Sequence, residues 1–124
     1  MRACLIVLGL IHFITGPIAF FAPEAFYEAI PGAKMMGPFN IHFIRDVGLT
    51  FIVSGGAMIY GALHWNQGVA VVGAAWPALH ALFHIQIQIS RGLPFDFIMA
   101  FDFFAVVLPA FAAMFLAYRL PDAA

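Results

Sequence analysis

The sequence predicts an all-α, polytopic membrane protein, built as a bundle of four transmembrane helices in a single domain over residues 1–124. Its composition is the first reason. Hydrophobic residues make up 65% of the 124 positions and charged residues 9%, whereas a soluble domain has about 25% charged and about 45–50% apolar residues. So few charges cannot cover a surface that faces water, and the chain is therefore expected to lie in a bilayer.

Four long apolar stretches are the second reason. A helix crosses the hydrocarbon core with about 20 mostly apolar residues, and barrel strands would be about half as long and would alternate. The predicted spans run over residues 3–22, 41–63, 69–89 and 95–118. Proline lies within three of them, at Pro17, Pro77 and Pro109, and is expected to free a backbone carbonyl and kink each helix.

The longest connection, residues 23–40, contains a short amphipathic segment from Pro23 to Ile30. Proline in the first turn, followed by Glu24, is typical of a helix start, and Pro31 and Gly32 end the segment. We expect a short interfacial helix between the first and second spans.

Charge and cysteine content narrow the possible partners. The formal net charge is −1, which excludes the clustered basic face that nucleic-acid binding needs. The single cysteine, Cys4, excludes an intrachain disulfide and a cysteine-based zinc site. The expected partner is the lipid bilayer, with a membrane-protein partner or a homo-oligomer left open. Arg2, Arg119 and the terminal amine favour cytoplasmic termini under the positive-inside rule.

Charged residues inside the spans are expensive, so each needs a reason. The second and fourth spans begin, and the third ends, on the same side of the membrane. At 1.5 Å per residue, polar groups of all three helices should lie about 6–8 Å deep in one leaflet. The sequence thus predicts a polar pocket or clamp within the bundle. Its expected members are His42, Arg45, Asp46, His84, Gln88 and Asp102.

Helical spacing suggests how these residues meet. His42, Arg45 and Asp46 share a face that Leu49 and Val53 continue, and this face is expected to point inward. His80, His84 and Gln88 are spaced i, i+4, i+8. Adjacent residues on a helix point about 100° apart, so we expect Arg45 to pair with Asp102 and Asp46 with His84. The cluster would then fix helix register, or bind a ligand or move protons.

The histidines allow two cofactor hypotheses. His80 and His84, at i, i+4, could join Asp46 and Asp102 around zinc or non-haem iron. His12 and His80, both near the midplane on different helices, could instead be the axial ligands of a haem. A buried carboxylate beside a histidine would also suit acid–base catalysis, although no motif identifies a substrate.

The stretch GPFNIHFIRDVG, residues 37–48, and the layout of four spans with a longer first loop resemble the DoxX-like group of small bacterial inner-membrane proteins. The resemblance implies a four-helix bundle in the bacterial inner membrane. Some members of that group are linked to redox complexes. The resemblance implies no catalytic residue in this chain.

Two functions remain open at this point. The first is a small membrane protein whose polar pocket binds a small ligand or metal. The second is an accessory subunit of a larger membrane complex, possibly a redox complex, without chemistry of its own. A proton-coupled transporter is a third option, but four spans without an internal repeat would need an oligomer to build alternating access.

Overall fold

The computed structural model describes residues 1–122, and over that range its regular elements are all helices, without a strand. The helices are α1 (Arg2–Phe21), α2 (Pro23–Ala29), α3 (Ala33–Met36), α4 (Ile41–Leu63), α5 (Gln67–Ser90), α6 (Phe97–Phe101), the π-helix η1 (Asp102–Val107) and α7 (Leu108–Tyr118). Four segments are long and apolar enough to cross a membrane: α1, α4, α5 and the continuous run from α6 to α7. The all-α class and the four predicted spans are confirmed at this level.

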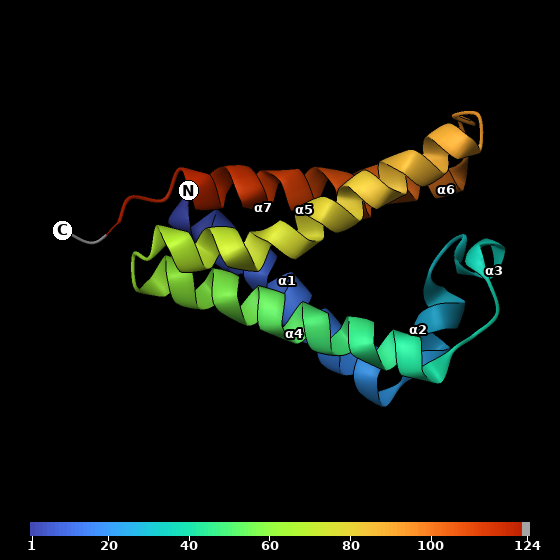
Figure 1. Ribbon diagram of the computed structural model, residues 1–124, viewed down its shortest axis with the longest axis horizontal. Coiled ribbons are helices and arrows are strands. Elements are labelled where there is room, and N and C mark those ends of the chain that lie inside the picture. Colours follow the sequence, from blue (N-terminus) through green and yellow to red (C-terminus); the bar gives the residue numbers. More distant parts are fainter. Residues whose placement is uncertain (123–124) are drawn as a thin grey trace.

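The four long segments form two arms (Figure 1). In this view α1 and α4 make the lower arm, and α5 lies with α6 and α7 in the upper arm. The arms meet at the end that holds both termini and the α4–α5 turn, and they diverge toward the opposite end, where α2 and α3 lie beside the lower arm. The polar residues discussed below belong to the diverging end.

Asparagine and aspartate side chains begin the later spans. The side chain of Asn40 accepts a hydrogen bond from the Phe43 amide, and that of Asn66 accepts one from the Val69 amide. Both satisfy amide groups that the first turn of a helix leaves without a partner. These caps start α4 and α5 at the residues where the apolar stretches begin.

Glycine allows α1 and α4 to pack backbone against backbone. A Cβ placed on Gly16 would lie 2.6 Å from the Gly48 carbonyl oxygen, and one placed on Gly55 would lie 2.6 Å from the Gly9 carbonyl oxygen. No side chain fits in such a gap. The glycine face of α4 is therefore fixed against α1, and this contact decides which residues of α4 point away from the bundle.

Small residues also fill the junction of the two arms. Three alanines of α5 spaced four residues apart, Ala70, Ala74 and Ala78, are buried, and Gly61 of α4 packs directly on Ala70. Leu5, Met58 and Leu120 are the large side chains buried at this junction. The tight core therefore lies at the end with the termini, and the other end is left open.

The fourth span is interrupted by the π-helix η1. Its end is marked by the Leu108 amide, which donates to the Phe103 carbonyl five residues back. Pro109 follows directly, in the first turn of α7. Proline has no N–H, and its ring clashes with the carbonyl four residues earlier, here that of Ala105, so a wider turn precedes it. The prolines of the other two spans, Pro17 and Pro77, lie inside continuous helices.

Between the first two long helices the chain forms α2 and α3. The expected helix over residues 23–30 appears as α2, with Pro23 in its first turn. Glu28 of α2 pairs with Lys34 of α3 at 2.5 Å, and the Tyr27 hydroxyl donates to the Gly37 carbonyl at 2.7 Å. These contacts tie the two short helices to each other and to the start of α4. The location of α2 in a membrane interface stays a prediction.

Candidate functional site

A cleft of about 570 Å³ lies between the diverging arms. Its walls come from α1, α4, α5, α6 and η1, and the α2–α3 segment contributes a further side. Most of the lining is apolar, with Phe26, Phe51, Phe83 and Phe101 among its aromatic side chains. A concave apolar space of this size with a few polar groups is the usual form of a small-molecule site.

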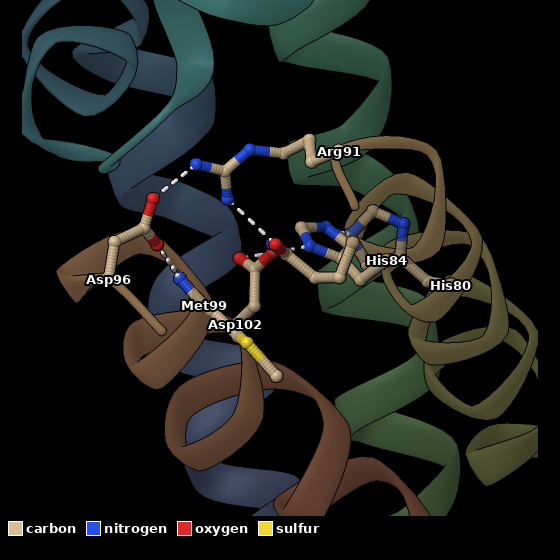
Figure 2. A network of polar contacts seen from close by, with 7 residues as sticks. His80, His84, Arg91, Asp96, Met99 and Asp102 are labelled. Atoms are coloured by element: carbon tan, nitrogen blue, oxygen red, sulfur yellow. Dashed lines mark hydrogen bonds and ion pairs between the residues drawn. The ribbon is translucent and has the colours of Figure 1, made fainter. Parts of the chain in front are cut away.

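A connected set of polar side chains runs along one wall (Figure 2). Asp96 caps α6 by accepting from the Met99 amide at 2.8 Å, and it also accepts from Arg91. Arg91 donates to the side-chain oxygen of Gln88, Oε1, at 2.7 Å. The side-chain nitrogen of Gln88, Nε2, in turn donates to Asp102. The series joins the exposed α5–α6 turn to a buried carboxylate.

The inner end of this series is deeply buried. Gln88 and Asp102 are each 5% exposed. Beyond them, His84 Nδ1 lies 3.1 Å from Asp102 Oδ1, and His84 Nε2 shares a hydrogen bond of 3.1 Å with His80 Nε2. The His84 Nδ1 atom is buried and its contact with Asp102 is not aligned as a hydrogen bond. The polar wall is therefore satisfied up to Asp102 and incompletely satisfied at His84.

Aromatic rings continue from the histidines across the cleft. His80 stacks on Trp76 with the ring planes 9° apart, Trp76 meets Phe51 edge to face, and Phe51 contacts His12 of α1. His12 Nδ1 bonds to the Leu8 carbonyl at 2.9 Å. Histidines of both arms thus line the same cleft.

Two charged groups at the membrane ends have shifted pKa values. The pKa of Asp96 is lowered, first by the hydrogen bond from the Met99 amide and then by Arg91. The pKa of Lys34 is raised by its hydrogen bond and charge contact with Glu28. Each shift favours the charged form, so both pairs are ionic near neutral pH.

The structure brings together part of the predicted site. His84, Gln88 and Asp102 lie in one network with His80, and all four line the cleft. His80, His84 and Gln88, predicted to share one face of a helix, therefore form part of one wall of the cleft. Within residues 1–122, His84, Gln88 and Asp102 are the members of the predicted cluster that contact one another across different helices at the cleft.

The predicted inward position of the α4 residues is wrong. His42, Arg45 and Asp46 are exposed and do not line the cleft. Arg45 Nε donates to the Phe20 carbonyl at 3.2 Å, and Asp46 Oδ2 lies 3.4 Å from His42 Nε2. The expected pairs of Arg45 with Asp102 and of Asp46 with His84 do not form.

The physical reason is that only one face of α4 can pack on α1, and the glycine face and the charged face compete for that position. The glycine face of α4 packs on α1, and this turns the opposite face outward, with Leu49 47% and Val53 72% exposed. Arg45 and Asp46 lie only about one helical turn from the start of α4, and charged side chains near the end of an apolar helix avoid the cost of deep burial. Close packing therefore sets the rotation of this helix, and charge does not.

The predicted metal site is not formed either. Among residues 1–122, no group of three or more His, Cys, Asp or Glu side chains is arranged to hold a metal ion. Asp46 lies on the outer face of α4, and His80 and His84 use their Nε2 atoms for a hydrogen bond to each other. The predicted axial pair for a haem, His12 and His80, lines the cleft, and haem binding stays a prediction.

Sequence reasoning missed several parts of the site. The α2–α3 segment, including Tyr27 and Met35, forms a side of the cleft, although it was expected only to lie in the interface. The link from Asp96 through Arg91 was also missed. Gln88 and Arg91 are at i, i+3, a spacing at which helical side chains meet, and this signal could have found the link.

A search among protein-family models, curated proteins and solved structures found no match for this chain. The resemblance to DoxX-like proteins therefore stays a prediction that rests on residues 37–48 and on the layout of the spans.

Proposed function

We propose that this protein is a multi-pass protein of the bacterial inner membrane, with its termini in the cytoplasm, that binds a small lipophilic molecule in the cleft between its two arms. The observation that carries the proposal is the 570 Å³ cleft itself, whose apolar lining is joined on one wall by the network of His80, His84, Gln88 and Asp102. Resemblance to the DoxX-like group supports the choice of membrane.

The shape of the bundle favours binding over a purely structural clamp. A polar clamp holds two helices together by filling the space between them. Here the network lies at the edge of a space that stays open, and His84 Nδ1 is left without a hydrogen bond. A bound molecule would fill the apolar space beside the polar wall.

The proposal can be tested by native mass spectrometry of the protein extracted gently from its own membrane. We expect the chain to carry one molecule of excess mass. Ala105 of η1 lines the cleft, and Ala100, five residues earlier on α6, is exposed and lies outside it. Ala105→Trp should fill the cleft and remove the excess mass, and the matched control Ala100→Trp should retain it. A bare native chain, or equal behaviour of the two variants, would refute the proposal.

A second candidate function is an accessory subunit of a larger membrane complex, and the outer face of α4 favours it. His42, Arg45 and Asp46 are exposed there beside apolar Leu49 and Val53. Polar groups on a membrane-facing helix often bind another helix. In this case the chain would migrate with a partner in native gels, and replacing Arg45 and Asp46 with leucine would release it without changing the occupancy of the cleft.

A further inference from the structure

The hydrogen-bonding groups of the cleft restrict the chemistry of its occupant. Four side chains of the lining carry donors that are already bonded to protein acceptors. Thr15 donates to the Ile11 carbonyl, Tyr27 to the Gly37 carbonyl, Gln88 to Asp102, and Arg91 to Gln88 and Asp96. The amide of Asn40 is at an exposed position, where water can reach it. One or more donors of each of these four side chains are therefore committed to the protein, and Arg91 and Gln88 keep further N–H groups.

The histidines of the cleft, in contrast, have acceptors to offer. His12 Nδ1 bonds to the Leu8 carbonyl, which can only accept, so Nδ1 carries the proton. In an uncharged imidazole the other nitrogen, Nε2, then has a free lone pair. Burial in an apolar wall favours this uncharged form. No protein donor among residues 1–122 bonds to His12 Nε2.

The same reasoning applies to the pair on α5. A lone pair on His84 Nδ1 would face the Asp102 carboxylate at 3.1 Å and be repelled, so Nδ1 carries the proton. In an uncharged His84 ring Nε2 then accepts, and His80 Nε2 donates the hydrogen bond of 3.1 Å between them. The remaining nitrogen of His80, Nδ1, is left as an acceptor. Each arm thus contributes to the lining of the cleft one histidine whose second ring nitrogen has an uncommitted lone pair.

The Asp102 carboxylate in the wall of the cleft is not free to bind a cationic ligand. Asp102 is the one acidic residue among the described residues that line the cleft. It is 5% exposed, receives the Gln88 amide on one oxygen and faces His84 with the other. An ammonium group in the cleft would lack an open carboxylate to balance its charge, and in an apolar space that charge is costly.

We propose that the molecule bound in the cleft is a lipophile with an uncharged hydroxyl group, an alcohol or a phenol, which donates a hydrogen bond to His12 Nε2 or His80 Nδ1. This inference rests on the proposed function, because it names the class of ligand for the same cleft. The apolar body would lie against the phenylalanine side chains, and the hydroxyl would meet the histidines that line both arms.

Three probes of nearly equal size and shape test the inference on the full chain in detergent micelles. They are 4-octylphenol, its methyl ether 4-octylanisole, which accepts but cannot donate, and 4-octylbenzylamine, which is cationic. Dissociation constants can be measured by native mass spectrometry. One net hydrogen bond should make the phenol bind roughly three- to tenfold more tightly than the anisole, and the amine should bind more weakly than the phenol.

Histidine variants locate the acceptor. His12→Phe and His80→Phe keep a ring of similar size, and at least one of them should bring phenol binding down to the level of anisole while leaving anisole binding unchanged. His64 lies outside the cleft and contacts Tyr60, so His64→Phe should keep the full preference. Retained anisole binding shows that a variant is folded.

The outcomes separate the two proposals. If neither phenol nor anisole binds the native protein, the proposed function fails and this inference fails with it. If both bind equally, or the amine binds best, the cleft is a binding site but the inference on its ligand is overturned. A phenol preference that survives in both histidine variants would also overturn it.

Discussion

Replacing Gly55 with alanine is the sharpest test of how the arms are built. A Cβ at this position would lie 2.4 Å from the Phe13 amide nitrogen, about 1 Å short of the 3.4 Å where ordinary contact begins. The obstacle is backbone, which cannot rotate away, so α1 and α4 must separate. Overpacking of this kind costs about 1–3 kcal/mol.

The neighbouring glycine provides a matched control. A Cβ on Gly56 would meet only the Phe13 ring, at 3.8 Å, an ordinary contact. Both substitutions gain the same helix propensity, about 0.5–1 kcal/mol, so this gain cancels in the comparison. The free energy of unfolding of Gly55→Ala should therefore be lower than that of Gly56→Ala by about 1–3 kcal/mol.

Reversible unfolding in mixed micelles with increasing SDS measures this difference, with helix content followed by circular dichroism. The result bears on the site as well, because the contact of Gly55 with α1 fixes the rotation that turns Arg45 and Asp46 outward. Equal stability of the two variants would refute the claim that close packing sets this rotation. The predicted inward position of the charged residues would then need to be considered again.

Three further predictions concern single polar groups. The pKa of Asp96 is lowered in the folded chain, so the stability that its carboxylate contributes is present above the ordinary value of 3.8 and is lost as the pH falls through the lowered one; unfolding titrations of Asp96→Asn at several acidic pH values should lack this component. Tyr27→Phe removes the hydrogen bond to the Gly37 carbonyl and should lower the unfolding free energy by about 0.5–1.5 kcal/mol, with faster amide exchange confined to α2 and α3. Asp46→Asn should leave ligand occupancy in native mass spectra unchanged, because Asp46 lies outside the cleft; a loss of ligand would contradict the site described here.

The spans and one wall of the cleft could be predicted from the sequence because they depend on local patterns. Apolar length defines a membrane helix, and the i, i+4, i+8 spacing of His80, His84 and Gln88 places them on one face whatever lies opposite. Their meeting with Asp102 followed from topology, since the end of one span and the start of the next lie at the same depth. These inferences needed no knowledge of how the helices rotate.

The rotation of α4 could not be predicted in this way. Its sequence carries two competing signals, a charged face at Arg45 and Asp46 and a glycine face at Gly48 and Gly55. A buried charge needs a partner, so the predicted orientation of this helix follows its charged face. Near the end of a membrane helix, the glycine contact matters more than the burial of the charges. A charged side chain there can reach the surface from several rotations of the helix, whereas the backbone contact through glycine forms in only one rotation.

The π-helix explains how one span serves both the core and the cleft. An α-helix turns about 100° per residue, and a π-helical turn holds an extra residue, so side chains before η1 are rotated by about that angle relative to those after it. Ala113 and Ala117 of α7 can therefore pack into the core while Asp102, at the start of η1, meets Gln88 and His84. Such turns are rare within α-helices and are frequent at functional sites. The wider turn that precedes Pro109 thus also brings the buried carboxylate to the cleft, and a local irregularity of this kind is expected at a binding site.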